Sequence, residues 1–169
     1  GHLNLGAGRI VYQELSRINM SIKNRELESN NTLTEAFNYA KKNKKNIHLI
    51  GLISNGGVHS HYSHLCELIR ISNNYESNIF IHGFTDGRDV DPKASLTDLE
   101  NLEEYISDKN CEIASVIGRY YSMDRDNRWD RTKLAYDLIC KGQGKQTTNF
   151  ISEIKNSHME KCTDEFLKP

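Results

Sequence analysis

Three short segments concentrate the residue types that bind small anions or carry out catalysis. Residues 54–61 (SNGGVHSH), 86–89 (DGRD) and 118–129 (GRYYSMDRDNRW) combine glycine with histidine, aspartate and several arginines. Glycine permits tight turns, and the planar guanidinium of arginine matches the oxygen geometry of phosphate and carboxylate groups. These segments therefore favour a small anionic ligand.

Ordinary surface ion pairing is an alternative explanation for the arginines. Arg119, Arg125 and Arg128 lie close in sequence to the aspartates within residues 124–130, and mixed charge runs of this kind usually form exposed pairs that contribute little stability. The argument for a binding site therefore depends on whether the three segments come together in space.

A metal site is a second alternative. His59, His61 and His64 are closely spaced, and imidazoles at such spacing can share a first-row metal. Only His59 and His61 are candidate ligands, and only if a carboxylate such as Asp86 or Asp89 joins them, because His64 falls where the next helix begins. That arrangement would suit a metal-dependent hydrolase. Direct contact of His59 with a substrate is favoured over metal binding, and capping or packing is the remaining alternative for these histidines.

The elements that would position these segments are three short apolar runs at residues 47–53, 79–84 and 113–117. Each run is nearly continuous, as expected for strands buried on both faces, and helix-period segments lie between and after them. This alternation predicts an α/β fold, three-layered, with a mostly parallel sheet and helices on both faces. His48 and His82 fall inside two of the strands and are interpreted as core histidines.

The helix boundaries have their own signals. Thr32 and Glu35 form the pattern of a capping box, which predicts a helix running to about Asn43. Asn127 is predicted to cap the helix that follows it, and the last helix is predicted at residues 147–158.

The chemistry-bearing segments follow the three predicted strands directly. In an open parallel sheet, ligands bind outside the carboxyl ends of the strands, because the strand-to-helix loops converge there. The sequence therefore predicts that all three segments meet at one edge of the sheet.

Composition narrows the class of protein. The chain has 169 residues, 22 Lys+Arg against 23 Asp+Glu and a net charge of −1, which suits one globular domain and argues against a nucleic-acid binder. No apolar run approaches the roughly 18 residues of a membrane span. The four cysteines form no Cys-x-x-Cys pair, so we expect reduced thiols in a cytoplasmic protein.

The motifs resemble those of the cofactor-independent (2,3-bisphosphoglycerate-independent) phosphoglycerate mutases. The similar segments are residues 1–9 (family G-H-x-N-x-G-A-G-R), 56–61 (G-G-V-H-S-H), 86–89 (D-G-R-D) and 119–129 (R-Y-Y-x-M-D-R-D-N-R-W), with the T-D-E-F of residues 163–166 also typical. These long motifs occur in order over essentially the whole chain.

The resemblance implies a two-domain enzyme of glycolysis and gluconeogenesis that interconverts 3- and 2-phosphoglycerate through a phosphoserine, without requiring 2,3-bisphosphoglycerate. One domain, similar to alkaline phosphatase, carries two manganese ions (Mn2+) and the serine nucleophile, and the inserted transferase domain holds the substrate. Residues 1–14 would end the phosphatase-like segment and form the linker. Residues 15–169 would form the transferase domain, incomplete at its C-terminus.

The resemblance also implies the site residues and the partners. The substrate contacts fall on His59, Arg88, Asp89, Arg119 and Arg125, with Asp89 as the candidate acid or base that takes the proton of the free hydroxyl. The implied partners are phosphoglycerate and the phosphatase-like domain of the same parent chain, in a monomer with no nucleic acid and no membrane.

The sequence departs from the family chiefly in what it lacks. The serine nucleophile, the metal-binding aspartates and histidines, and the R-A-D-R arginines all fall outside this sequence, so we expect no metal ligands in this chain and no mutase activity from it alone. Asn55 stands where an aspartate is expected. A stand-alone small-anion-binding module without catalysis is the alternative function.

Overall fold

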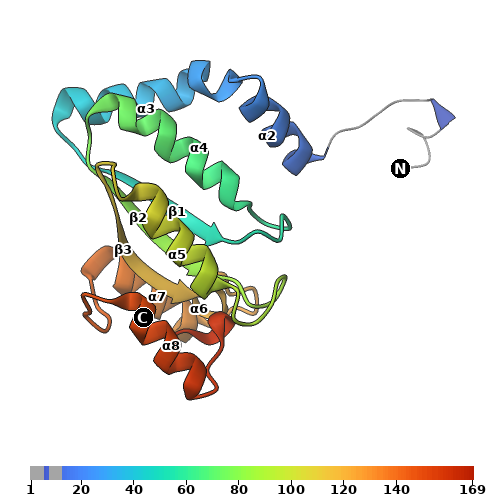
Figure 1. The fold of residues 1–169 in the computed structure, drawn as a ribbon, viewed down its shortest axis with the longest axis vertical. Coiled ribbons are helices and arrows are strands. Elements are labelled where there is room, and N and C mark those ends of the chain that lie inside the picture. Colours follow the sequence, from blue (N-terminus) through green and yellow to red (C-terminus); the bar gives the residue numbers. More distant parts are fainter. Residues whose placement is uncertain (1–5, 8–12) are drawn as a thin grey trace.

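The computed structural model describes residues 6–7 and 13–169, so most of the motif at residues 1–9 and most of the linker predicted at 1–14 lie outside the described residues. The elements follow in the order α2 (Glu14–Lys23), η1 (Glu26–Ser29), α3 (Asn31–Asn43), β1 (Ile47–Ile53), α4 (Tyr62–Ser72), η2 (Asn73–Tyr75), β2 (Ile79–Thr85), α5 (Ser95–Ile106), β3 (Cys111–Gly118), α6 (Arg119–Ser122), α7 (Trp129–Lys141), α8 (Phe150–Met159) and η3 (Asp164–Phe166) (Figure 1).

The three strands form one parallel sheet in the order β1-β2-β3. β1 and β2 pair in continuous register from Ile47 opposite Ile79. Between β2 and β3 the register shifts after Ile81, which faces Ile113, so that His82 faces Ser115. The α/β fold with a parallel sheet is confirmed, and the carboxyl ends of all three strands point toward one edge.

The main hydrophobic core lies between one face of the sheet and helices α4, α5 and α8. Ile53 and Ile81 of the sheet pack there against Ile69, Leu99 and Leu102, all essentially buried. These side chains come from alternate strand positions and from one stripe of each helix, as the sequence periodicity predicts. The core holds the sheet rigid beneath the loops at its edge.

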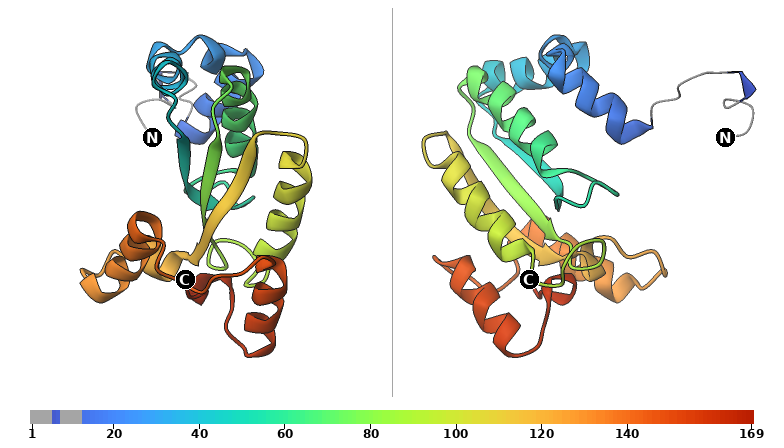
Figure 2. Two further views of the ribbon diagram at one scale, coloured as in Figure 1. Left: turned by 90° about the vertical axis from the view of Figure 1, so that its left-hand side faces the viewer. Right: turned by 45° about the vertical axis from the view of Figure 1, so that its right-hand side comes forward.

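Helices lie on both sides of the sheet, as predicted, but they cover the second side less fully. α5 and α8 lie on one side and α7 lies on the other, beside β3 (Figure 2). On the second face of β1, His48 is exposed and Ile50 keeps 55% of its surface accessible. The first half of β1 therefore alternates in burial, whereas its continuous apolar sequence predicted burial on both faces; Leu52 and Ile53 at its end are both buried.

A hydrogen-bonded row of polar side chains crosses that second face. His48 Nδ1 lies 2.9 Å from His82 Nε2, and His82 Nδ1 lies 2.8 Å from Ser115 Oγ. His82 is buried and hydrogen-bonded on both ring nitrogens, as predicted for a core histidine, whereas His48 is exposed. The row links all three strands.

Burial of His82 makes the stability of the fold sensitive to pH. Burial, together with the neighbouring His48, lowers the pKa of His82 from its ordinary value of 6.5. The unfolded chain therefore takes up this proton at a higher pH than the folded chain, and the free energy of unfolding is expected to fall as the pH drops below 6.5.

The measurement is urea denaturation of the wild type and of His82→Gln from neutral to mildly acidic pH. We expect a shallower pH dependence in the variant. Some dependence persists in it, because burial and the nearby His61 also lower the pKa of His64. An unchanged pH dependence in His82→Gln would show that this histidine does not titrate as described.

Two predicted caps are wrong. α3 begins two residues earlier than the capping box suggests, because Asn30 is the cap and its side chain accepts a hydrogen bond from the Leu33 N–H at 3.1 Å. At α7 the cap position is Arg128, and Asn127 instead adopts a left-handed conformation with φ of 56°.

Within the described residues, no helix combines the length and the apolar character needed to cross a bilayer.

Candidate anion-binding site

The loops that follow β1, β2 and β3 meet at one edge of the sheet and share one hydrogen-bond network. Ser54, at the end of β1, is buried and donates a hydrogen bond from Oγ to Asp86 Oδ2 at 2.7 Å. Ser54 Oγ also accepts a hydrogen bond from the Gly56 N–H at 3.0 Å. Gly57 follows with φ of 69°, a conformation that glycine adopts at no steric cost. Ser54 thereby fixes the turn that leads to His59.

Asp86 is the centre of this network. It is 2% exposed, and its Oδ1 accepts the backbone N–H groups of Arg88 and Asp89 at 3.2 and 3.0 Å. Burial would raise the pKa of Asp86, but the hydrogen bonds from Ser54, from the Asp89 backbone and from Arg119 outweigh it and lower the pKa below 3.8. Asp86 is thus an ionised anchor that shapes the second loop.

Arg119, the first residue of α6, joins the second and third loops. It is 5% exposed, and its Nη1 donates to Asp86 Oδ1 and to Asp89 Oδ2, both at 2.6 Å. Among the described residues, both bonds use Nη1, and no hydrogen bond engages Nη2 or Nε. A buried guanidinium between two carboxylates is held in a fixed orientation before any ligand arrives.

Asp89 connects Arg119 to the first loop. Its Oδ2 lies 3.6 Å from His59 Nε2, and its side chain is 20% exposed, against 47% for His59. The predicted substrate residues His59, Asp89 and Arg119 are therefore brought together by three different loops. The alternative explanation, an exposed ion pair, does not apply to Arg119, because its carboxylate partners belong to this buried network.

Arg88 lies at the same edge, but its side chain pairs with Glu165 and not with the other candidate residues. Its Nε donates to Glu165 Oε1 at 2.9 Å, and its Nη2 bonds the same oxygen. Glu165 belongs to η3, far along the chain, and nothing in the spacing of the sequence pointed to this partner. Arg88 joins the network through its backbone, by the N–H bond to Asp86.

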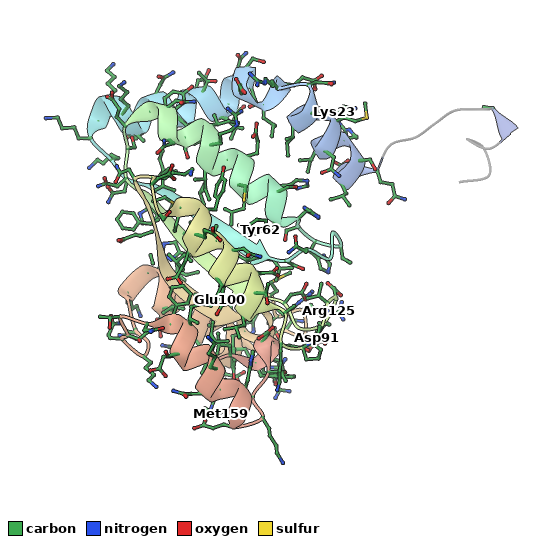
Figure 3. The ribbon with its side chains drawn as sticks, viewed as in Figure 1. Lys23, Tyr62, Asp91, Glu100, Arg125 and Met159 are labelled. Atoms are coloured by element: carbon green, nitrogen blue, oxygen red, sulfur yellow. The ribbon has the colours of Figure 1, made fainter. Side chains whose placement is uncertain are left out.

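Arg125 stands on an exposed loop whose shape is set by Asp124. Asp124 Oδ2 accepts the backbone N–H groups of Asp126 at 3.3 Å and of Arg128 at 2.8 Å. Arg131, which the sequence analysis missed, bonds Asp124 Oδ1 at 3.2 Å and lies 3.8 Å from the centre of the Tyr120 ring. Figure 3 labels Arg125 and Asp91 at the end of the sheet toward which the strands point.

The histidines of the first loop do not form a metal centre in the described part of the chain. His61 Nδ1 is within 2.8 Å of Ser63 Oγ and accepts the Ser63 N–H, so it caps α4. His64 bonds the side-chain oxygen of Asn19 in α2 at 2.6 Å. Among the described residues, no group of three or more His, Cys, Asp or Glu side chains is placed to hold a metal ion. The hydrolase alternative therefore gains no support.

Asn55 makes its own contact beside the site. Its amide donates to Asp98, a buried carboxylate in α5. Burial raises the pKa of Asp98, and the Asn55 bond offsets part of that effect. An amide at this position therefore meets a carboxylate without charge repulsion.

The candidate residues lie apart from the pocket beside β3. A cavity of about 160 Å3 lies elsewhere, between β3 and α8, and none of the candidate residues lines it. Fold and site together define an α/β domain with arginine and histidine side chains gathered at the carboxyl edge of a parallel sheet.

Comparison with known proteins assigns the family. The family model described as "BPG-independent PGAM N-terminus" matches residues 18–169, and the chain belongs to this family. The chain is thus related to the N-terminal part of the 2,3-bisphosphoglycerate-independent phosphoglycerate mutases, which confirms the resemblance.

Curated relatives support the same assignment. The 2,3-bisphosphoglycerate-independent phosphoglycerate mutase of Flavobacterium psychrophilum is 54% identical over all of this chain, and that of Bacteroides fragilis is 49% identical. The chain spans only 34% of the length of each of these relatives.

A solved structure agrees on the fold. A Leishmania mexicana phosphoglycerate mutase, determined at low cobalt concentration, matches 95% of this chain and 31% of its own, with a TM-score of 0.84 and 26% identity.

Proposed function

We propose that residues 15–169 form the substrate-holding transferase domain of a cytoplasmic 2,3-bisphosphoglycerate-independent phosphoglycerate mutase that acts in glycolysis and gluconeogenesis. The observation that carries the proposal is Arg119, buried at the meeting point of three loops and held by Asp86 and Asp89 with part of its guanidinium free. The mutase names of the relatives supply the substrate class.

The chemistry of phosphoglycerate suits this edge of the sheet. The molecule offers a carboxylate, a hydroxyl and a dianionic phosphate. Arg88, Arg119 and Arg125 can bind the two anionic groups with paired N–H donors, and His59 adds a further donor. The proposed role of Asp89 is to accept a hydrogen bond from the free hydroxyl and to take its proton as that oxygen attacks the phosphorus of a phosphoserine and the serine oxygen leaves.

The remaining chemistry would come from the rest of the parent protein. The resemblance assigns the serine nucleophile and two manganese ions to the phosphatase-like domain, and the described residues offer no cluster suited to such ions. The proposed role of this chain is to retain glycerate while the phosphoryl group is on the serine. We therefore expect the chain alone to bind phosphoglycerate as a monomer and to show no turnover in a coupled assay supplied with Mn2+.

Isothermal titration with 3-phosphoglycerate, 2-phosphoglycerate and inorganic phosphate tests the proposal. Both phosphoglycerates should bind more tightly than inorganic phosphate. Arg125→Ala should weaken phosphoglycerate binding about tenfold to a hundredfold, because a charge-assisted hydrogen bond contributes about 1.5–3 kcal/mol.

The matched control is Arg17→Ala, because Arg17 is an exposed arginine of α2 that pairs only with Glu14 among the described residues. This variant should bind like the wild type. Equal affinities for phosphoglycerate and inorganic phosphate would instead indicate a general small-anion module, and no binding of either would contradict both functions.

A further inference from the structure

The segment η3 crosses the carboxyl ends of β2 and β3 at close range. Thr85, the last residue of β2, donates from Oγ1 to the carbonyl of Asp164 at 2.6 Å, and the N–H of Gly118, the last residue of β3, donates to the carbonyl of Leu167 at 2.8 Å. In Figure 1 this red segment lies beside the ends of the strands. η3 is therefore fastened directly to the two strands from which Asp86 and Arg119 follow.

Asp164 anchors this crossing. It is fully buried, its Oδ2 accepts the Ser95 N–H at 2.8 Å, and its Oδ1 lies 2.6 Å from His158 Nε2. Its own N–H donates to the carbonyl of Pro92 at 3.0 Å. These bonds tie η3 to α5, to α8 and to the loop after β2. A side chain fastened on so many sides leaves the next residue, Glu165, little freedom to move.

Glu165 uses this fixed position to hold Arg88. One oxygen, Oε1, accepts hydrogen bonds from both Nε and Nη2 of Arg88, which sets the plane of the guanidinium. The Glu165 side chain is only 13% exposed, against 38% for Arg88. Among the described residues, no hydrogen bond engages Arg88 Nη1. Nη1 is therefore the guanidinium nitrogen of Arg88 that is left without a hydrogen bond in the described part of the chain.

We propose that Glu165 is a positioning residue that fixes Arg88 in the orientation in which it receives an anion, and that the buried pair of Asp164 and His158 fixes Glu165. This inference rests on the proposed function, because it assigns Arg88 to the substrate. A long arginine side chain loses rotamer freedom when it binds a ligand, and an arginine already held by a carboxylate has lost much of that freedom beforehand.

The competing explanation is a structural ion pair with no effect on ligand binding. Half-exposed pairs often contribute little stability, so the presence of the pair alone does not decide the matter. The two explanations differ in whether the effect of Glu165 on binding passes through Arg88. A double-mutant cycle measures this directly.

The cycle compares 3-phosphoglycerate affinity in the wild type, Glu165→Gln, Arg88→Ala and the double variant, each checked for folding by thermal unfolding. Glu165→Gln should weaken binding about threefold to tenfold, the range expected for ordering one long side chain. In the Arg88→Ala background, the same change should have no effect on binding.

Glu160→Gln is the matched control, because Glu160 is an exposed carboxylate after α8 with no ion pair among the described residues. It should bind like the wild type. Glu165→Asp, which keeps the charge on a shorter side chain, should fall between the wild type and Glu165→Gln. Equal loss of affinity from Glu165→Gln in both backgrounds, or no loss in either, would overturn the inference.

A ligand-free measurement separates this inference from the proposed function. In 15N NMR spectra, the Arg88 Nε–H signal should be protected from exchange in the wild type and exposed in Glu165→Gln, while the Arg119 signal is unchanged. Protection of Arg88 without any phosphoglycerate binding would contradict the proposed function alone. An Arg88 signal that exchanges equally fast in both proteins would contradict the role of Glu165.

Discussion

Replacing Arg119 with alanine is expected to lower the free energy of unfolding by about 3–5 kcal/mol, the usual cost of breaking a buried ion pair, and to abolish phosphoglycerate binding. Arg119 and Asp86 have side chains only 5% and 3% exposed. Without the guanidinium, the Asp86 carboxylate remains buried with a charge that only neutral donors offset. Urea denaturation and isothermal titration measure the two effects.

A second variant separates stability from binding. In Arg119→Ala combined with Asp86→Asn, the unpaired charge is removed, so part of the lost stability should return while binding stays absent. In the folded wild type, hydrogen bonds lower the pKa of Asp86 below its ordinary value of 3.8. Ionised Asp86 therefore stabilises the fold fully above pH 3.8, and this stabilisation is lost as the pH falls through the lowered folded-state pKa. An unchanged denaturation midpoint in Arg119→Ala would contradict the buried network.

Of the glycine-to-alanine changes in the described fold, Gly118→Ala should destabilise the protein most. A Cβ atom at Gly118 would lie 2.3 Å from the backbone oxygen of Glu165 and 2.7 Å from the backbone nitrogen of Leu167. Backbone atoms cannot yield by a rotamer change, so η3 must move away. We expect a loss of about 1–3 kcal/mol or more in unfolding free energy, together with weaker phosphoglycerate binding.

Gly51→Ala is the control for this prediction. Gly51 lies in β1, and nothing in the described structure lies within 4 Å of a Cβ atom built there. The same glycine-to-alanine change should leave binding intact at Gly51 and change the thermal unfolding temperature little. Similar stability of Gly118→Ala and Gly51→Ala would show that η3 does not cross β3 as closely as described.

The sequence predicts the strands well because each apolar run is short and bounded by polar loops. β1 matches its predicted range, β2 ends one residue later, and β3 begins earlier, at Cys111. Cys111 and Glu112 escaped prediction because β3 alternates in burial at its start and so lacks the continuous apolar signal.

The sequence predicts those parts of the site that directly follow a strand. It does not predict those that depend on contacts between residues far apart in the chain. The position of His59, Asp89 and Arg119 after three parallel strands was enough to predict that their loops meet. The pairing of Arg88 with Glu165, by contrast, joins residues on different elements with no shared period or spacing. The placement of Arg131 over Tyr120 depends in the same way on how α7 packs against α6.

The most direct test of the central claim is a 15N NMR titration of the 169-residue chain with 3-phosphoglycerate. Binding at the carboxyl edge of the sheet predicts that the amide signals of residues 56–59, 86–89 and 119–126 shift together along one saturating curve. Signals of α3 and of the His48 face of the sheet should stay in place. Absence of shifts at high ligand concentration, or shifts confined to the cavity between β3 and α8, would contradict phosphoglycerate binding at these loops.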